Sequence, residues 1–282
     1  MAFFPPDNEF PPVPSICHGE TISTPSLFNL TGKTALVTGG NGGIGSGMAR
    51  GLAEAGADII IIQIPGEVSS VAEQLRADTG RRVDVYECDL AKSDAIRKTL
   101  DGILKRDQRS VDILCNVAGI SGGFVPVLTE TDAHRELVVQ IHYHAVYVLS
   151  QLVGRHMAER GQGGKIINVA SIAAERAMTR FSVYGPVKAA VGQLTNSLAN
   201  ELAIYNIQVN VLCPGTTSWI HTPMSDRSFG DEEASNRILK TIPAGRWGKP
   251  SDFKGVTVFL ASAASDYVTG ARIHVSGGTH GM

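Results

Sequence analysis

Residues 38–45 read Thr-Gly-Gly-Asn-Gly-Gly-Ile-Gly, and this stretch decides the fold class of the chain. It follows an apolar run, Lys33–Thr38, and precedes a segment of helical length, residues 44–55. Glycines at such a strand-to-helix turn let the backbone bend sharply and approach a pyrophosphate, whose charge then lies at the helix N-terminus. The loop therefore predicts a dinucleotide site. Its expected contacts are Gly39, Asn41, Gly43, Ile44 and Gly45.

The same alternation continues along the rest of the chain. Seven apolar runs have the length of strands: Lys33–Thr38, Asp58–Gln63, Arg82–Glu87, Val111–Asn116, Lys165–Ala170, Ile207–Cys213 and Arg272–Val275. Helix-length segments lie between them, at 44–55, 68–78, 92–107, 132–160, 185–205 and 250–262. Strands that alternate with helices imply right-handed crossovers. We therefore expect an α/β fold with a single Rossmann-type, doubly wound, parallel, seven-stranded sheet and helices on both faces.

The composition excludes several classes of protein. The chain has 282 residues, 43% of them hydrophobic and 18% charged, which is typical of a globular protein rather than a disordered or fibrous one. Its 25 basic and 27 acidic residues give a net charge of −2, so no basic surface for nucleic acid or an anionic membrane is expected. No apolar run approaches the roughly 20 residues that a membrane span needs. We expect neither nucleic acid nor membrane as a partner.

The cysteines and histidines give no sign of a metal site. Cys17, Cys88, Cys115 and Cys213 lie far apart, without a C-x-x-C pair. In a chain able to build a large core they are expected to be reduced and mostly buried, which favours a cytoplasmic location. The eight histidines form no H-E-x-x-H motif and no cluster with cysteine, so no metal is predicted.

Residues 1–30 differ in composition from the rest of the chain. They hold six of the thirteen prolines and neither lysine nor arginine, so the basic region of a secretory signal is missing. Proline density of this kind favours an extended segment. We expect a Pro-rich N-terminal arm over 1–30 and one domain over 31–282.

Three residues form the strongest catalytic signal. Tyr184 and Lys188 are four residues apart, which places them on one face of a helix, and Ser171 follows the fifth predicted strand. A phenol has a pKa of about 10, and an adjacent ammonium group stabilises the phenolate and lowers that pKa. Tyr184 could then exchange a proton with a substrate oxygen.

These motifs resemble those of the short-chain dehydrogenase/reductase family, from about Leu30 to Met282. The resemblance rests on the glycine loop and on Y-x-x-x-K at Tyr184–Lys188. Three further family motifs also match: Asp89-Leu90, Asn116-Val117-Ala118-Gly119 (with Val117 in place of a second Asn) and Pro214-Gly215. The resemblance implies that Tyr184 is the general acid/base, that Lys188 lowers its pKa and holds the nicotinamide ribose, and that Ser171 binds the substrate oxygen. It also implies cofactor contacts at Asp89, Leu90, Asn116, Ala118, Gly119, Tyr184, Lys188, Pro214 and Gly215.

The end of the second strand bears on the choice of dinucleotide. An acidic residue there would accept both ribose hydroxyls of NAD, whereas a nearby arginine would pair with the 2′-phosphate of NADP. This chain has Gln63, whose neutral amide can bind hydroxyls but cannot neutralise a phosphate. We therefore expect NAD(H) to be favoured over NADP(H), with Gln63 as a cofactor contact.

Two positions depart from the family pattern. Where many relatives carry an Asn whose backbone holds a water of the proton relay, this chain has His142, which is either a tolerated packing residue or part of an altered proton path. Where relatives place a Thr after Pro-Gly, it has Trp219, so Thr217 and Thr222 are the candidates for binding the carboxamide. The long segment at about 216–242 is expected to act as a lid over the substrate.

The substrate is less defined by the sequence. Ile242–Asp252 and Ala261–Val268 resemble sugar-acid dehydrogenases, such as deoxygluconate and gluconate 5-dehydrogenases, and 3-oxoacyl reductases. A sugar acid would need a cationic partner, with Arg176, Arg180 and Arg227 as candidates, whereas the apolar stretch 124–128 favours a less polar carbonyl.

The predicted activity is NAD(P)(H)-dependent interconversion of a secondary alcohol and a ketone, with a small-molecule alcohol or carbonyl as partner. The alternative is a dinucleotide-binding protein with a non-redox or regulatory role. The uncharged segment Ala189–Asn200 also predicts helix packing between copies of the chain in a homodimer or homotetramer.

Overall fold

The computed structural model describes residues 22–68, 70–120, 125–215 and 232–281. Their centre is one seven-stranded sheet with the order β3-β2-β1-β4-β5-β6-β7, in which every neighbouring pair is parallel. The strands are β1 Thr34–Thr38, β2 Asp58–Gln63, β3 Val83–Glu87, β4 Ile113–Asn116, β5 Gly164–Val169, β6 Ile207–Pro214 and β7 Arg272–Val275. The predicted doubly wound parallel sheet is thus confirmed.

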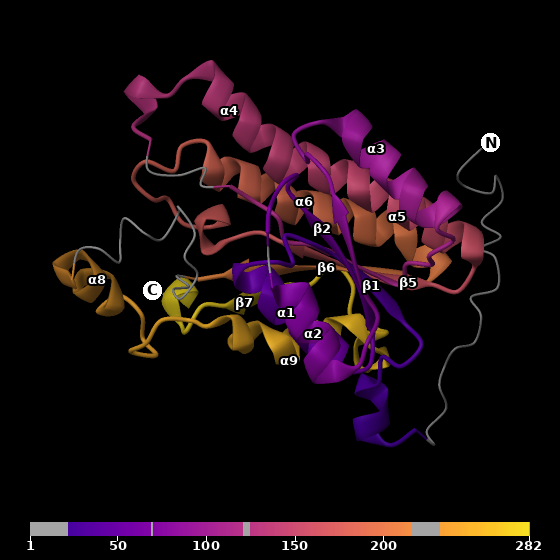
Figure 1. Cartoon of the computed structure of the whole chain (residues 1–282). Helices are drawn as coiled ribbons and strands as arrows, with labels where there is room; N and C mark the ends of the chain where they lie inside the picture. Colours follow the sequence, from indigo (N-terminus) through magenta and orange to yellow (C-terminus); the bar gives the residue numbers. More distant parts are fainter. Residues whose placement is uncertain (1–21, 69, 121–124, 216–231, 282) are drawn as a thin grey trace.

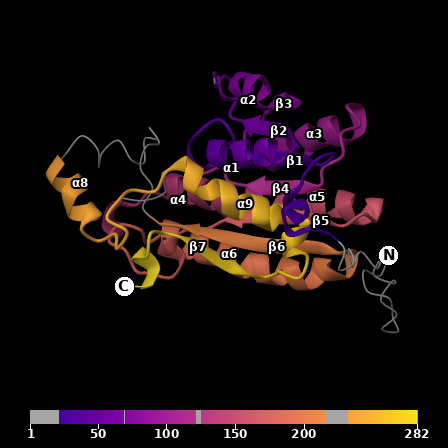
Figure 2. The ribbon, with the colours of Figure 1, turned by 90° about the horizontal axis from the view of Figure 1, so that it is seen from below.

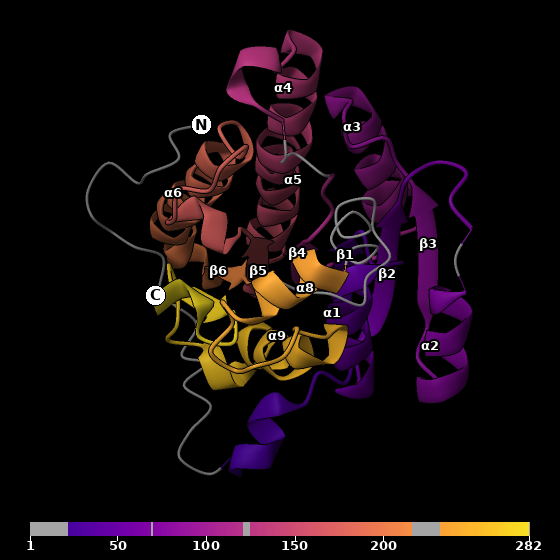
Figure 3. The same cartoon turned by 90° about the vertical axis from the view of Figure 1, so that its left-hand side faces the viewer.

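Helices cover both faces of the sheet, as Figures 1 and 3 show. One face carries α3 Ser93–Asp101, α4 Asp132–Val139, α5 Ala145–Arg160 and α6 Tyr184–Leu202. The other carries α1 Gly43–Glu54, α2 Val71–Thr79 and α9 Lys254–Ala261, and Figure 2 shows α1 and α9 side by side. A further helix, α8 Glu232–Leu239, precedes α9.

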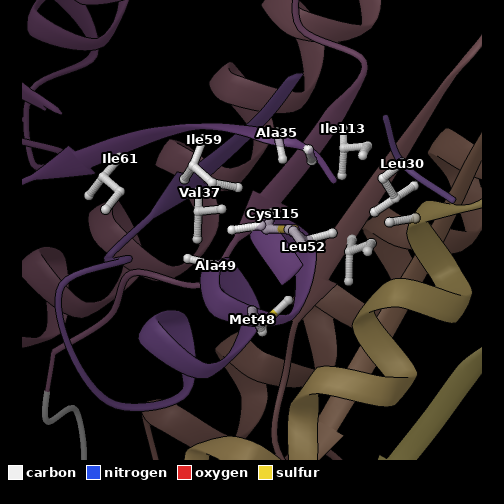
Figure 4. Close-up of a cluster of buried hydrophobic side chains, with 14 of the residues drawn as sticks. Leu30, Ala35, Val37, Met48, Ala49, Leu52, Ile59, Ile61, Ile113 and Cys115 are labelled. Carbon is white, nitrogen blue, oxygen red and sulfur yellow. The ribbon is translucent and has the colours of Figure 1, made fainter. Parts of the chain in front are cut away.

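The central strands are buried on both faces, as expected for a parallel sheet. All five residues of β1 and all eight of β6 are buried. Figure 4 shows the apolar side chains of β1, β2 and α1 that pack together on the α1 face. In α1, a Cβ added at Gly47 would overlap the Pro250 carbonyl, and one at Gly51 would lie 2.9 Å from Lys254 Cα. These glycines therefore allow α9 to pack closely against α1.

The predicted strands agree with the observed ones to within two residues at each end. The segment 132–160, expected as one helix, is instead α4 and α5 joined by a π-helical turn, Gln140–His144. A π turn inserts one residue into the helical repeat and is frequent at functional sites. Its central residue is His142, which it directs into the interior.

Most of the predicted N-terminal arm lies outside the described residues. The described part contains a short 3₁₀ helix, Thr24–Phe28, and Leu30, which is 1% exposed and belongs to the core on the α1 face. The Leu30 amide donates a hydrogen bond to the Ala55 carbonyl at 2.8 Å. Within the described ranges, no helix combines the length and apolar character required of a membrane span.

Candidate active site

The glycine loop joins β1 to α1 at the carboxyl edge of the sheet. Gly39 and Gly43 have φ values of +67° and +54°, a left-handed conformation that favours glycine. A Cβ added at Gly45 would overlap the Gly39 carbonyl, so the loop closes only with glycine there. The loop leads into the N-terminus of α1, where the free amides and the helix dipole attract an anion. This backbone cradle fits the pyrophosphate of a dinucleotide.

Thr38 connects this loop to the stretch after β4. Its hydroxyl accepts hydrogen bonds from the backbone amides of Val117 at 3.0 Å and Ala118 at 3.1 Å. A Cβ added at Gly39 would lie 3.0 Å from the Ala118 Cα. The predicted contacts Gly39 and Ala118 are therefore brought together, and a threonine hydroxyl holds the two loops at a fixed separation.

Gln63 lies beside the glycine loop, as predicted. Its Oε1 accepts a hydrogen bond from Asn41 Nδ2 at 2.5 Å, and its Nε2 donates to the Glu67 carbonyl at 2.7 Å. Asn41 Nδ2 also lies 3.3 Å from a Glu67 carboxylate oxygen. The Asn41 side-chain oxygen is buried and has no partner among the described residues. Glu67, which the sequence did not single out, places a negative charge at this end of the site.

Asp89, Leu90 and Asn116 follow neighbouring strands at the same edge. The Asp89 carboxylate accepts a hydrogen bond from the Ala91 amide and pairs with Lys92 at 3.0 Å, which lowers its pKa. Asn116 is buried, and its amide donates to Ser150 Oγ at 3.1 Å and Asn168 Oδ1 at 2.9 Å. The Asn116 side chain thus also joins β4 to β5 and α5.

The three predicted catalytic residues converge at the end of β5. Ser171 caps a short 3₁₀ helix, Ile172–Ala174, and its hydroxyl accepts a hydrogen bond from the Ala173 amide at 3.1 Å. Tyr184 begins α6, and its phenol is hydrogen-bonded to Ser171. The Lys188 ammonium group lies 5.7 Å from the centre of the Tyr184 ring and donates to the Val169 carbonyl at 2.8 Å. Tyr184 and Lys188 are buried and Ser171 is half-buried, so the three side chains form one largely enclosed constellation.

Burial dominates the acid–base properties of this constellation. It raises the pKa of Tyr184 to about 12, although the hydrogen bond with Ser171 lowers it, and it lowers the pKa of Lys188 to about 8. The structure therefore does not show the lowered phenol pKa that was expected from Lys188. Removing the phenol from water disfavours the phenolate more than the hydrogen bond with Ser171 stabilises it. Burial therefore favours the neutral form of the Tyr184 phenol.

His142 is a packing neighbour of Tyr184. Its ring is 2% exposed and meets the Tyr184 ring edge-on, with centroids 5.3 Å apart. His142 Nε2 lies 3.0 Å from the Ile120 carbonyl and 3.3 Å from the Ile120 amide, whereas Nδ1 has no described partner. Burial and the Lys188 charge lower the pKa of His142 to about 3, so the imidazole is neutral. These contacts agree with the interpretation of His142 as a packing residue.

A cavity of about 780 Å³ adjoins the start of α6. Its wall includes Val127 and Leu128 on one side and the segment 173–182 on the other, with Arg176 and Arg180 among its residues. Arg176 donates to the Thr279 carbonyl at 2.5 Å, whereas Arg180, with a φ of +67°, has no ion-pair partner in the described part of the chain. The cavity thus combines apolar side chains with an available cation.

The remaining predicted contacts belong to the segment that follows β6. Thr217, Thr222, Trp219, Arg227 and most of the predicted lid lie outside the described residues. Pro214 ends β6, and the Gly215 amide donates to the Val275 carbonyl at 3.0 Å, so this pair is held at the carboxyl edge of the sheet. A Cβ added at Gly215 would lie 2.6 Å from Ser276 Cα, which explains the glycine.

Comparisons with known proteins agree with this site. A family model described as enoyl-(acyl carrier protein) reductase matches residues 39–280. The chain belongs to the short-chain dehydrogenase/reductase family, and it is an NAD(P)-dependent oxidoreductase of the secondary alcohol and ketone type.

Several of the relatives that it resembles are named as dehydrogenases of sugar acids. The chain is 41% identical to 2-dehydro-3-deoxy-D-gluconate 5-dehydrogenase of Bacillus subtilis over 89% of its own length and 96% of that protein. It is 35% identical to gluconate 5-dehydrogenase of Gluconobacter oxydans, covering 91% and 98%. A solved gluconate 5-dehydrogenase of Burkholderia cenocepacia, in complex with NADP and tartrate, is 35% identical, with a TM-score of 0.85 over 92% of this chain and all of that one.

These comparisons bear on two expectations. They support the enzymatic interpretation over a non-redox dinucleotide-binding protein, because the relatives are dehydrogenases. They support NAD(P) as the cofactor, but the expected preference for NAD(H) finds no support in them, since the solved relative holds NADP.

Proposed function

We propose that this protein interconverts a hydroxyl and a keto group on a sugar acid, with Tyr184, Lys188 and Ser171 as its catalytic residues. The observation that carries the proposal is the contact of the buried Tyr184 with the half-buried Ser171, with the buried Lys188 one helical turn away from Tyr184. The constellation lies at the sheet edge that also carries the glycine cradle. When bound there, the nicotinamide cofactor would supply or accept the hydride.

In the direction of ketone reduction, Tyr184 donates a proton to the substrate oxygen. Its raised pKa keeps the phenol protonated and ready to donate. The Ser171 hydroxyl binds the same oxygen and stabilises the negative charge that develops on it. The buried Lys188 ammonium, held by the Val169 carbonyl, stabilises the phenolate left on Tyr184. In the direction of alcohol oxidation, the same proton returns to Tyr184.

Arg180 is the proposed partner of the substrate carboxylate. It lines the cavity beside α6, and no carboxylate of the described residues neutralises it. Arg176 lines the same cavity but already donates to the Thr279 carbonyl. A guanidinium can bind a carboxylate through two parallel hydrogen bonds. The sugar-acid substrates in the names of the relatives support this assignment, whereas the exposed Val127 and Leu128 at the cavity support a less polar substrate.

For the cofactor, we propose a modest preference for NAD(H). Glu67 and the amide of Gln63 form a neutral-to-negative environment beside the glycine loop. Arg50, Arg81 and Arg82 could pair with a phosphate, but each is engaged in an ion pair. Arg50 pairs with Asp78 and Arg81 with Asp58, each at 2.7 Å, and Arg82 pairs with Asp84 at 2.9 Å. A 2′-phosphate would therefore meet no described cation here and would be repelled by Glu67. The NADP bound to the solved relative argues for the opposite choice, so both dinucleotides need to be titrated.

We also propose a homodimer or homotetramer assembled through α5 and α6. The segment 189–200 carries no charge, and Tyr147 on α5 is 42% exposed. Light scattering at micromolar concentration tests this assembly, and a monomer would contradict it. The described cysteines Cys88, Cys115 and Cys213 are free and buried, which supports the expected reducing, cytoplasmic location.

A substrate panel tests the proposed activity. The chain is incubated with NADH or NADPH and a set of keto sugar acids, the corresponding neutral keto sugars and apolar ketones, and the absorbance of the reduced cofactor is followed. We expect turnover of at least one keto sugar acid and weaker turnover of the neutral sugar of the same length. Turnover of the apolar ketones alone would contradict the assignment of the substrate class.

A further inference from the structure

A second cluster of polar side chains lies where β6 and β7 end. Cys213 and His274 are direct partners in the parallel register of these strands, so their side chains project from the same face of the sheet. Glu175, at the end of the 3₁₀ helix that Ser171 begins, reaches the same place. The Cys213 sulfur, a ring nitrogen of His274 and a carboxylate oxygen of Glu175 all lie within 4.8 Å of one another.

Neighbouring side chains hold the ligand atoms of this cluster in position. The two Glu175 oxygens lie 3.0 and 3.1 Å from His274 Nε2, close to the roughly 3.3 Å between two ligands at about 2.0 Å from a tetrahedral metal ion. Arg272 Nη1 binds Glu175 Oε1 at 2.7 Å, so the carboxylate is held by Arg272 on one side and by His274 on the other. The His280 ring stacks on His274 at 4.0 Å and 7°. Such outer contacts fix the orientation of metal ligands.

We propose that Cys213, His274 and Glu175 bind one Zn²⁺ ion per chain, with water as the fourth ligand. Thiolate, imidazole and carboxylate are the ligand types that zinc takes in proteins, and a thiolate disfavours Mg²⁺ and Ca²⁺. Cys213 is buried, whereas the side chains of Glu175 and His274 are 31% and 18% exposed, which opens the cluster to solvent. On binding, the thiol loses its proton to solvent as the Zn–S bond forms.

The site would couple to catalysis, and this part rests on the proposed function. Cys213 directly precedes Pro214-Gly215, and its thiol interacts with the Ser171 backbone and with the Lys188 charge. Drawing the Cys213 sulfur towards His274 would shift the end of β6 relative to Ser171. Zinc occupancy is therefore expected to reduce turnover. No sequence motif indicated this cluster, because its ligands come from three separate elements that only the fold brings together.

Metal titration of the full-length chain tests the proposal without any need for a substrate. Cd²⁺ serves as the spectroscopic probe, since a cadmium–thiolate bond gives an ultraviolet charge-transfer band, and Zn²⁺ binding is measured by calorimetry. We expect one equivalent of each metal to bind. Cys213→Ser should remove the band, and Glu175→Gln and His274→Ala should each weaken zinc binding roughly tenfold or more. Cys17→Ser and Cys88→Ser are the matched controls and should keep the band.

Three results would overturn the zinc site: no band in the wild type, a band that survives Cys213→Ser, or a band lost in Cys17→Ser. Should Cys213→Ser fail to fold, unchanged zinc affinity in both Glu175→Gln and His274→Ala would overturn it instead. Zinc should lower turnover in the wild type and have a weaker effect in His274→Ala. Equal inhibition of both would contradict the coupling to catalysis. Failure of the proposed function would appear as absence of turnover in metal-free protein, which the cadmium band does not depend on.

Discussion

Gly119 and His142 are predicted to be coupled in stability. A Cβ added at Gly119 would overlap Cε1 of His142 and lie 3.1 Å from its Nδ1. The His142 ring has little room to retreat, because it is 2% exposed, packs edge-on against Tyr184 and contacts the Ile120 backbone. Gly119→Ala is therefore an overpacking substitution, which is expected to lower the free energy of unfolding by about 1–3 kcal/mol.

A double-mutant cycle isolates this contact. His142→Ala removes the ring and destabilises the protein by itself through lost packing. In the double variant, the methyl group added at position 119 enters the space that the ring vacated, so most of its cost disappears. We expect the double variant to be more stable than the sum of the single effects by about 1 kcal/mol or more. Urea unfolding followed by intrinsic fluorescence, at one fixed protein concentration, gives the four free energies.

Gly255→Ala in α9 is the matched control for this cycle. A Cβ there meets nothing within 4 Å, so the substitution should be neutral or should stabilise the helix by about 0.5–1 kcal/mol. An unchanged stability of Gly119→Ala would refute the reasoning. Additivity of the two substitutions within about 0.5 kcal/mol would do so as well.

Three further predictions concern substrate, cofactor and pH. Arg180→Gln should raise KM for a sugar acid roughly tenfold with little change in kcat, because a charge-assisted bond of about 1.5–3 kcal/mol is lost. Initial-rate kinetics measure this effect, and Arg180→Lys serves as the milder variant. Glu67→Gln should strengthen NADPH binding relative to NADH in a fluorescence titration, because it removes the charge that repels the 2′-phosphate. Because the pKa of Lys188 is about 8, Lys188 loses its proton above that pH, and kcat/KM for ketone reduction should fall there. Lys188→Arg should flatten the high-pH side of the profile.

The sheet and the proximity of Ser171, Tyr184 and Lys188 could be predicted from the sequence because their signals are local. Burial on both faces makes each central strand a short apolar run, and the glycine loop and the Tyr184–Lys188 spacing are read within a few residues. The π turn at Gln140–His144 was missed because hydrophobic periodicity continues through it. Glu67 was missed because it belongs to a loop, whose position depends on contacts with Gln63 and Asn41.

The expected effect of Lys188 on Tyr184 failed for a different reason. The sequence indicated that the two residues share a helix face, but the pKa of the phenol also depends on how completely it is removed from water. Part of this burial comes from the packing of His142 against Tyr184, and His142 belongs to an element distant in sequence. Spacing alone therefore identified the pair but gave the wrong direction for the pKa of Tyr184.

The central claim is that Tyr184 transfers the proton during hydride exchange, and Tyr184→Phe tests it most directly. This substitution removes one buried oxygen and keeps the ring that packs against His142. Its turnover of the best substrate is compared with that of the wild type, and dinucleotide binding is titrated on the same preparations. The account predicts a loss of roughly 10²–10⁴-fold in kcat with dinucleotide affinity nearly unchanged. Full turnover by Tyr184→Phe, with a correctly folded protein, would contradict it.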